Sequence, residues 1–241
     1  MLVNVYGLRP GRATRDIDFG IAVQSWGQFK SLKEQMIATG EFSVDLKAQQ
    51  RLLYTDRSAG FSVPVDLIPF RGVASADNLI AWPPGRDVVL NVAGFEEAWV
   101  SSIPVNVEEG LTVRVASVPG LTLLKLVAWA DRRLESNKDA ADLHRLFTTY
   151  SDAGNLDRLY DQELALLEAV EFDLELAGAE LLGRDVARVC AGTTLEQVRT
   201  WLASPKFLDQ LVSHMVRTSI HSEGTTNVSR IVEVFSRGVL S

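Results

Sequence analysis

The stretch RATRDIDFGIAV, residues 12–23, has the period-two pattern of a β-strand and carries two carboxylates, Asp16 and Asp18. Alternate side chains of a strand share a face, which predicts a core face made of Ile17, Phe19, Ile21 and Val23. The opposite face is acidic at one end and small at the other, because it carries Asp16, Asp18, Gly20 and Ala22. We therefore expect open space above the two acids instead of a packed layer.

The composition is typical of a globular cytoplasmic protein. The chain has 241 residues, 46% of them hydrophobic, which excludes a disordered protein. No apolar run reaches the roughly 18 residues of a membrane-spanning helix, and the N-terminus lacks the basic and apolar regions of an export signal. The single Cys190 excludes an internal disulfide, which fits a reducing compartment. We expect a cytoplasmic protein with no membrane partner.

The formal net charge of −7 is concentrated in the C-terminal part of the chain. This balance excludes a basic footprint over the whole protein, of the kind that binds nucleic acid. A small basic cluster, Arg9, Arg12 and Arg15, lies directly before the acidic strand. It is either a solvated loop or one wall of a cleft that attracts phosphate groups.

The order of the patterns predicts an α+β protein, in which a mixed β-sheet core over residues 1–150 precedes a helical bundle over 151–241. A helix is expected from the capping residue Ser25 to Gly40, and a hairpin in RLLYTDRSAGFSVPVDLIPF, residues 51–70. DVVLNV, AWVSSIPVNV and LTVRVAS add strands, and the period becomes helical from Ser117 onward. Polar and small residues cluster at TTYSDAGN, which places the boundary near residue 150.

The hairpin supplies a third carboxylate, Asp66, among apolar neighbours. A buried carboxylate is costly unless it is neutralised, paired with a base or bound to a metal. The alternative is an edge strand open to water, which Pro64 favours. Acids on two strands are typical of a site for Mg²⁺, and Asp16 and Asp18, with Cα atoms about 6.6 Å apart, could bridge two ions about 3.5–4 Å apart.

The first helix after the sheet, SVPGLTLLKLVAWADRRLES, carries cations on a mostly apolar surface. Lys125, Trp129 and Arg132 fall on one stripe. Lys125 either extends its ammonium group to solvent or holds a triphosphate.

Two acids, Asp139 and Asp142, lie beside the apolar stripe of the next helix, NKDAADLHRLFTTY. Asp139 is explained adequately by the dipole at a helix N-terminus, which favours acids in the first turn. That explanation fits Asp142 less well, because Asp142 lies further into the helix.

Four blocks of the chain resemble the AbiEii/AbiGii-type nucleotidyltransferase family of the DNA polymerase β nucleotidyltransferase superfamily. They are R-x-T-x-D-I-D-F at 12–19, V-D-L-I-P-F at 65–70, S-V-P-G-L-T-L-L-K-L-V-A-W-A-D-R at 117–132 and K-D-A-A-D-L at 138–143. The blocks occur in the family's order, so the resemblance implies a nucleotidyltransferase-like core. Many members of this family are toxins of bacterial toxin–antitoxin pairs.

The resemblance implies a role for each site residue. Asp16, Asp18 and Asp66 would be catalytic and would bind two Mg²⁺ ions, with Mn²⁺ as an alternative. The nucleotide-binding residues would be Lys125, Arg132, Asp139, Asp142 and Arg15, with Lys125 on the phosphates. The implied reaction is transfer of a nucleotidyl group from an NTP to an acceptor such as tRNA or another RNA, and the implied protein partner is a cognate antitoxin.

One departure from the family pattern supports a second hypothesis. Family members carry a strand and a Gly-Gly or Gly-Ser turn before the D-x-D strand, and this turn holds the nucleotide phosphates. This sequence begins MLVNVYGLRPGRATRDID, where we expect neither that strand nor that turn. The second hypothesis is therefore a catalytically inactive nucleotidyltransferase fold that serves as a binding or partner-interaction module. A third is a metal-dependent phosphohydrolase.

Overall fold

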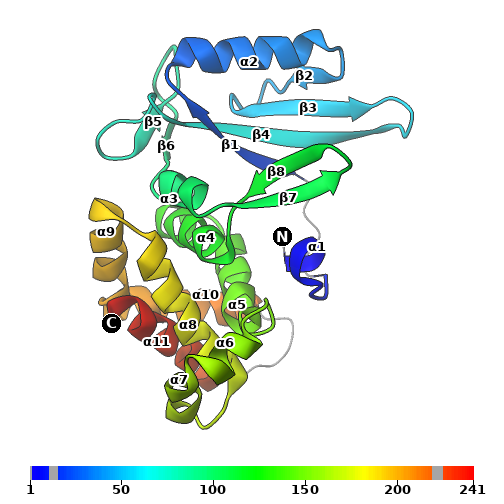
Figure 1. The fold of residues 1–241 in the computed structure, drawn as a ribbon. Helices are drawn as coiled ribbons and strands as arrows, with labels where there is room; N and C mark the ends of the chain where they lie inside the picture. The colour runs from blue at the N-terminus through cyan, green and yellow to red at the C-terminus, as the bar shows by residue number, and fades with distance from the viewer. Residues whose placement is uncertain (1, 11–15, 219–224) are drawn as a thin grey trace. The chain divides into compact units, whose positions relative to one another are not determined.

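The computed structural model describes residues 2–10, 16–218 and 225–241 (Figure 1). It divides into two compact units, residues 10–96 in one and residues 1–9 with 97–241 in the other, and each is described by itself. Strands dominate the first unit and helices the second, which confirms the α+β class. None of the helices described is long and apolar enough to cross a membrane.

Residues 10–96 are built on a mixed four-stranded sheet in the order β1-β4-β3-β2. The elements of this unit are β1 (Ile17–Val23), α2 (Trp26–Ala38), β2 (Phe42–Val44), β3 (Arg51–Asp56), β4 (Phe61–Arg71), β5 (Leu79–Ala81) and β6 (Val89–Asn91). β1 pairs with β4 in parallel, whereas β3 pairs with β4 and with β2 antiparallel. The predicted hairpin over residues 51–70 is therefore confirmed as β3 and β4.

Helix α2 covers one face of this sheet (Figure 1). It begins after Ser25, whose side chain accepts a hydrogen bond from the backbone N–H of Gln28, as the capping pattern predicts. Phe29 of α2 packs in one core cluster with Leu52, Val65 and Leu67 of the sheet. Since neighbouring residues of a strand point to opposite faces, Asp66 lies on the face away from this core.

The two prolines of β4 lie where this strand has a neighbour on one side only. The pairing with β1 begins at Val65, one residue after Pro64, and the pairing with β3 ends at Asp66, three residues before Pro69. Proline lacks the N–H that a central strand would donate, so it is tolerated at these positions. Asp66 falls in the short overlap in which both neighbours pair with β4, so the edge-strand alternative for Asp66 is wrong.

β1 forms an edge of the sheet, and its predicted core face is buried at one end only. Val23 is 2% exposed, whereas Ile17 and Phe19 are 49% and 45% exposed. The strand pattern is confirmed, but burial of the whole face is wrong. Alternation of side chains fixes which residues share a face and does not fix how far the covering layer extends along it.

The second unit contains a short hairpin followed by packed helices. Its elements are α1 (Leu2–Tyr6), β7 (Ile103–Glu108), β8 (Leu111–Val115), α4 (Val118–Arg132), α5 (Lys138–Thr149), α6 (Leu156–Asp161), α7 (Leu164–Ala169), α8 (Leu174–Val189), α9 (Gly192–Leu202), α10 (Pro205–Thr218) and α11 (Thr225–Leu240). The boundary between the two units lies within α3 (Phe95–Val100), between residues 96 and 97. The predicted boundary near residue 150 stays a prediction, and α5, which ends there, packs against α4 before it and against α8, α10 and α11 after it.

The strand expected in AWVSSIPVNV begins later than predicted. Residues 98–100 belong to α3, and β7 begins only at Ile103. Two acids, Glu96 and Glu97, follow the first residue of α3, where the helix dipole favours negative charge. These acids favour a helix at this point, although Trp99 and Val100 have a high β-propensity.

Two glycines allow α8 and α11 to approach each other closely. A Cβ atom on Gly183 would lie 2.2 Å from the carbonyl oxygen of Phe235, and one on Gly238 would lie 2.2 Å from that of Glu180. Both obstacles are backbone atoms, which a rotamer change cannot move. The two helices would have to separate to admit either methyl group.

Gly183→Ala is therefore expected to lower the free energy of unfolding by about 2 kcal/mol, as overpacking of a tight contact does. Chemical denaturation followed by far-ultraviolet circular dichroism measures this loss. Gly27→Ala in α2 is the control, because its Cβ would meet only the hydroxyl of Ser25 at 3.7 Å. A Gly183→Ala variant as stable as the parent would contradict the close approach of α8 and α11.

Candidate active site

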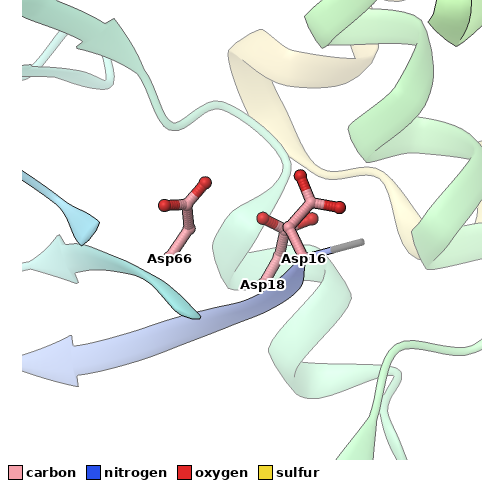
Figure 2. A group of neighbouring side chains, drawn as sticks. All are labelled: Asp16, Asp18 and Asp66. Carbon is pink, nitrogen blue, oxygen red and sulfur yellow. The ribbon is translucent and has the colours of Figure 1, made fainter. Parts of the chain in front are cut away.

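Strand pairing brings the three predicted acids together on one face of the sheet. Asp18 of β1 is the direct partner of Asp66 on β4, and directly paired residues of parallel strands point to the same face. Asp16 directly precedes β1, and its carboxylate lies close to those of Asp18 and Asp66 (Figure 2). One carboxylate oxygen from each of the three side chains lies within 4.8 Å of the others (Figure 2).

The three acids differ in burial. Asp16 and Asp18 are exposed, whereas Asp66 is only 8% exposed. Repulsion between three carboxylates at this separation is unfavourable, so positive charge nearby stabilises the cluster. The free space that we expected above Asp16 and Asp18 fits their exposure.

Part of this positive charge comes from Arg51, a residue that no sequence pattern singles out. Arg51 is the partner of Asp66 on β3, so Asp18, Asp66 and Arg51 form a row across three strands. Its Nε donates to Asp66 Oδ1 at 2.7 Å and its Nη2 to Asp66 Oδ2 at 2.8 Å. The hydrogen bond to Asp66 is the main reason that the pKa of Arg51 is raised above its ordinary value.

The arrangement fits a divalent cation with hard-ion chemistry. Mg²⁺ prefers oxygen ligands and is usually bound through one or two carboxylates together with water and substrate phosphates. Asp16 and Asp18 offer exposed carboxylates, and Asp66 offers a third from the adjacent strand. An ion between them would relieve their mutual repulsion, so these residues fit the magnesium site that the sequence predicts.

A second group of predicted residues lies on α4 and α5. Lys125 Nζ lies 2.7 Å from Asp142 Oδ2 and 3.5 Å from Asp139 Oδ1. Arg132 forms a two-pronged ion pair with Asp139, with Nε 2.6 Å from Oδ2 and Nη2 2.9 Å from Oδ1. Lys125 is therefore held between two carboxylates at the junction of the helices, and it does not simply extend into solvent.

Asp139 is the buried centre of this second group, with 1% of its side chain exposed. Burial raises the pKa of Asp139, but Arg132 and Lys125 outweigh burial and hold the pKa below the ordinary 3.8. A dipole at the helix N-terminus is thus not the whole explanation for this acid. Its ion pairs hold α4 and α5 together.

The lowered pKa of Asp139 predicts a pH dependence of stability. A carboxyl group whose pKa is lower in the folded than in the unfolded protein stabilises the fold above its unfolded pKa, and this contribution is lost as the pH falls through the folded pKa. The free energy of unfolding of the parent should therefore fall as the pH drops below about 4. Denaturation at a series of pH values measures how steeply the free energy of unfolding changes with pH. This slope should be smaller for Asp139→Asn than for the parent below about pH 4. Equal slopes would contradict a lowered pKa of Asp139 in the folded protein.

The structure places the predicted residues in two clusters, one in each compact unit. Asp16, Asp18 and Asp66 lie in the unit of residues 10–96, and the four residues of α4 and α5 lie in the other. Arg15 lies outside the described residues. Arg51 could have been found from sequence, because counting outward from the four-residue turn RSAG places it opposite Asp66.

The fold and the three acids define the class of this protein. It is a chain in which a mixed sheet carries three clustered carboxylates and is followed by a helical region. The chain belongs to the AbiEii family: the family model described as "Nucleotidyl transferase AbiEii toxin, Type IV TA system" matches residues 1–188. This match confirms the family resemblance that the sequence indicates. No curated protein and no solved structure matches the chain.

Proposed function

We propose that the protein is a metal-dependent nucleotidyltransferase that transfers a nucleotidyl group from an NTP to a hydroxyl of an RNA acceptor such as tRNA. The observation that carries this proposal is the placement of Asp16, Asp18 and Asp66 on one face of the sheet, with carboxylate oxygens within 4.8 Å of one another. Membership of a nucleotidyltransferase toxin family supports the reaction class. In the reaction the acceptor oxygen bonds to the α-phosphorus, and the bond from that phosphorus to the departing pyrophosphate breaks.

Asp16 and Asp18 are the residues that would hold Mg²⁺, or Mn²⁺ in its place, with Asp66 as the third ligand. Bound Mg²⁺ would supply a Lewis acid that lowers the pKa of the attacking hydroxyl and offsets charge on the triphosphate. A carboxylate of the cluster accepts the proton that the hydroxyl loses. Because Arg51 fixes the orientation of Asp66, the third carboxylate is already aligned before substrate binds.

Lys125 is proposed to bind the phosphates of the nucleotide. Its ammonium group carries three donors, and the ion pairs with Asp142 and Asp139 hold it at a fixed point on α4. Arg132 keeps Asp139 ionised and in place through two hydrogen bonds. Asp139 and Asp142 therefore act on the nucleotide through Lys125.

The family also supports a biological role as a toxin, with a cognate antitoxin as its protein partner and a nucleotide as its substrate. A catalytically inactive module is the second candidate. It is favoured by the position of β1, the strand that carries Asp18, at an edge of the described sheet, where the strand has a neighbour on one side only.

The proposal is tested by incubating the protein and Mg²⁺ with total tRNA and each of the four α-labelled NTPs. Label on RNA is the expected result. Release of labelled nucleotide without an acceptor would indicate a phosphohydrolase instead. Absence of label on RNA and on protein with every NTP would contradict an enzyme and favour the inactive module.

A further inference from the structure

Arg51 donates hydrogen bonds to both carboxylate oxygens of Asp66. Asp66 is the buried member of the carboxylate trio, which consists of Asp16, Asp18 and Asp66. A two-pronged pair of this kind is the strongest arrangement that a guanidinium and a carboxylate can form. The pair lies in a sheet ladder, with Arg51 and Asp66 held opposite each other by the register of β3 and β4. The guanidinium is therefore fixed beside the site where a metal ion would bind.

This contact places the guanidinium of Arg51 where it would repel a metal ion bound to Asp66. Arg51 neutralises one of the three carboxylates, so the cluster attracts a dication less strongly than it would without Arg51. Asp66 has lone pairs left on each oxygen, but an ion that uses them lies close to the guanidinium and is repelled by it. Arg51 and the metal ion thus compete for Asp66.

We propose that Arg51 is a positioning residue that acts as an internal counter-cation, so that metal binding to the free protein is weak and tightens only when nucleotide phosphates add negative charge. This inference rests on the proposed metal site and adds a regulation of it. Its consequence is that the protein loads metal together with the nucleotide. Without nucleotide, Arg51 keeps the acids from collecting divalent ions.

The test is binding of Mn²⁺ alone, without nucleotide, measured from the electron paramagnetic resonance of free Mn²⁺ in titrations of the full chain. Arg51→Gln removes the charge and keeps one polar contact, and it should bind Mn²⁺ at least about tenfold more tightly than the parent. Arg51→Lys keeps the charge and should stay within about threefold of the parent. Arg51→Met is a second charge-free variant for the case that the Gln variant does not fold.

Arg71→Gln is the matched control. Arg71 also forms a two-pronged ion pair, in which its Nε and Nη2 each donate to a carboxylate oxygen of Glu96 at 2.7 Å. Arg71 lies five residues along β4 from Asp66, about 16 Å away. Removing its charge should leave Mn²⁺ affinity unchanged. Tightening in Arg71→Gln equal to that in Arg51→Gln would show a general charge effect and overturn the inference.

The remaining outcomes separate this inference from the proposed function. Mn²⁺ binding that Asp18→Asn abolishes, but that is equal in the parent and Arg51→Gln, overturns the role of Arg51 and leaves the metal site intact. Weaker binding in Arg51→Gln also overturns it, because Arg51 would then only orient a ligand. Absence of Mn²⁺ binding in the parent and in the charge-free variants overturns the role of Arg51, and the proposed function is then judged by the label-transfer test alone.

Discussion

Replacement of Asp18 by Asn should lower nucleotidyl transfer by about a thousandfold and leave the fold intact, as removal of an essential electrostatic group does. Asp18 of β1 is directly opposite Asp66 on β4 and two residues after Asp16, which directly precedes β1. Asn has nearly the same shape but no charge, so the site would lose one of its three negative charges. Since Asp18 is exposed, the substitution should cost the fold little.

The measurement is the initial rate of label transfer to RNA at saturating Mg²⁺, with the circular dichroism spectrum and melting temperature as checks on folding. Asp77→Asn is the matched control, because Asp77 is exposed in the same unit and lies outside the carboxylate trio. It should transfer label at the parent rate. An Asp18→Asn variant with at least a tenth of the parent activity would contradict the assignment of this face of the sheet as the active site.

The strands and acids of the sheet could be predicted because alternation and turn chemistry are local properties. The alternation in residues 16–23 fixes which side chains accompany Asp16 and Asp18, and the turn between residues 56 and 61 fixes the hairpin. The parallel pairing of β1 with β4 is not local, because α2, β2 and β3 lie between them in sequence. That pairing decides that Asp18 faces Asp66.

Arg51 illustrates the opposite case, a functional residue without a signal of its own. It is the first residue of a strand, where a charged side chain usually points to solvent and needs no explanation. Only its register with Asp66 gives it a role. Register arguments can be applied to a sequence once a hairpin turn has been located.

The ion-pair group on α4 and α5 shows how the sequence pattern of a single helix leaves a structural and a functional interpretation open. A lysine on an apolar helix can extend to water, and an acid in a first turn can complement the helix dipole. The packing of α4 on α5 brings Lys125, Asp139 and Asp142 together, and the ion pairs between them exceed what either local explanation requires. Contact between the two helices is tertiary information that neither helix carries alone.

Lys125→Met should weaken NTP binding by about a hundredfold, because a charge-assisted contact to a phosphate is worth about 1.5–3 kcal/mol. Methionine keeps the unbranched apolar stem of lysine, so packing on α4 should persist while the charge is lost. Asp139 retains its pair with Arg132 in this variant, which should preserve the junction of α4 and α5. Binding is measured with each of the four NTPs in the presence of Mg²⁺.

Lys138→Met is the matched control for this prediction. Lys138 is the exposed first residue of α5, and its replacement by Met removes the same charge with the same change of side chain as Lys125→Met. NTP affinity should stay at the parent value in Lys138→Met and fall only in Lys125→Met. The reason is that Lys125 is the lysine that ion pairs with Asp139 and Asp142 hold in place. Equal affinity in both variants would place the phosphate-binding group elsewhere, and the ion pairs of Lys125 would then be part of the helix packing alone.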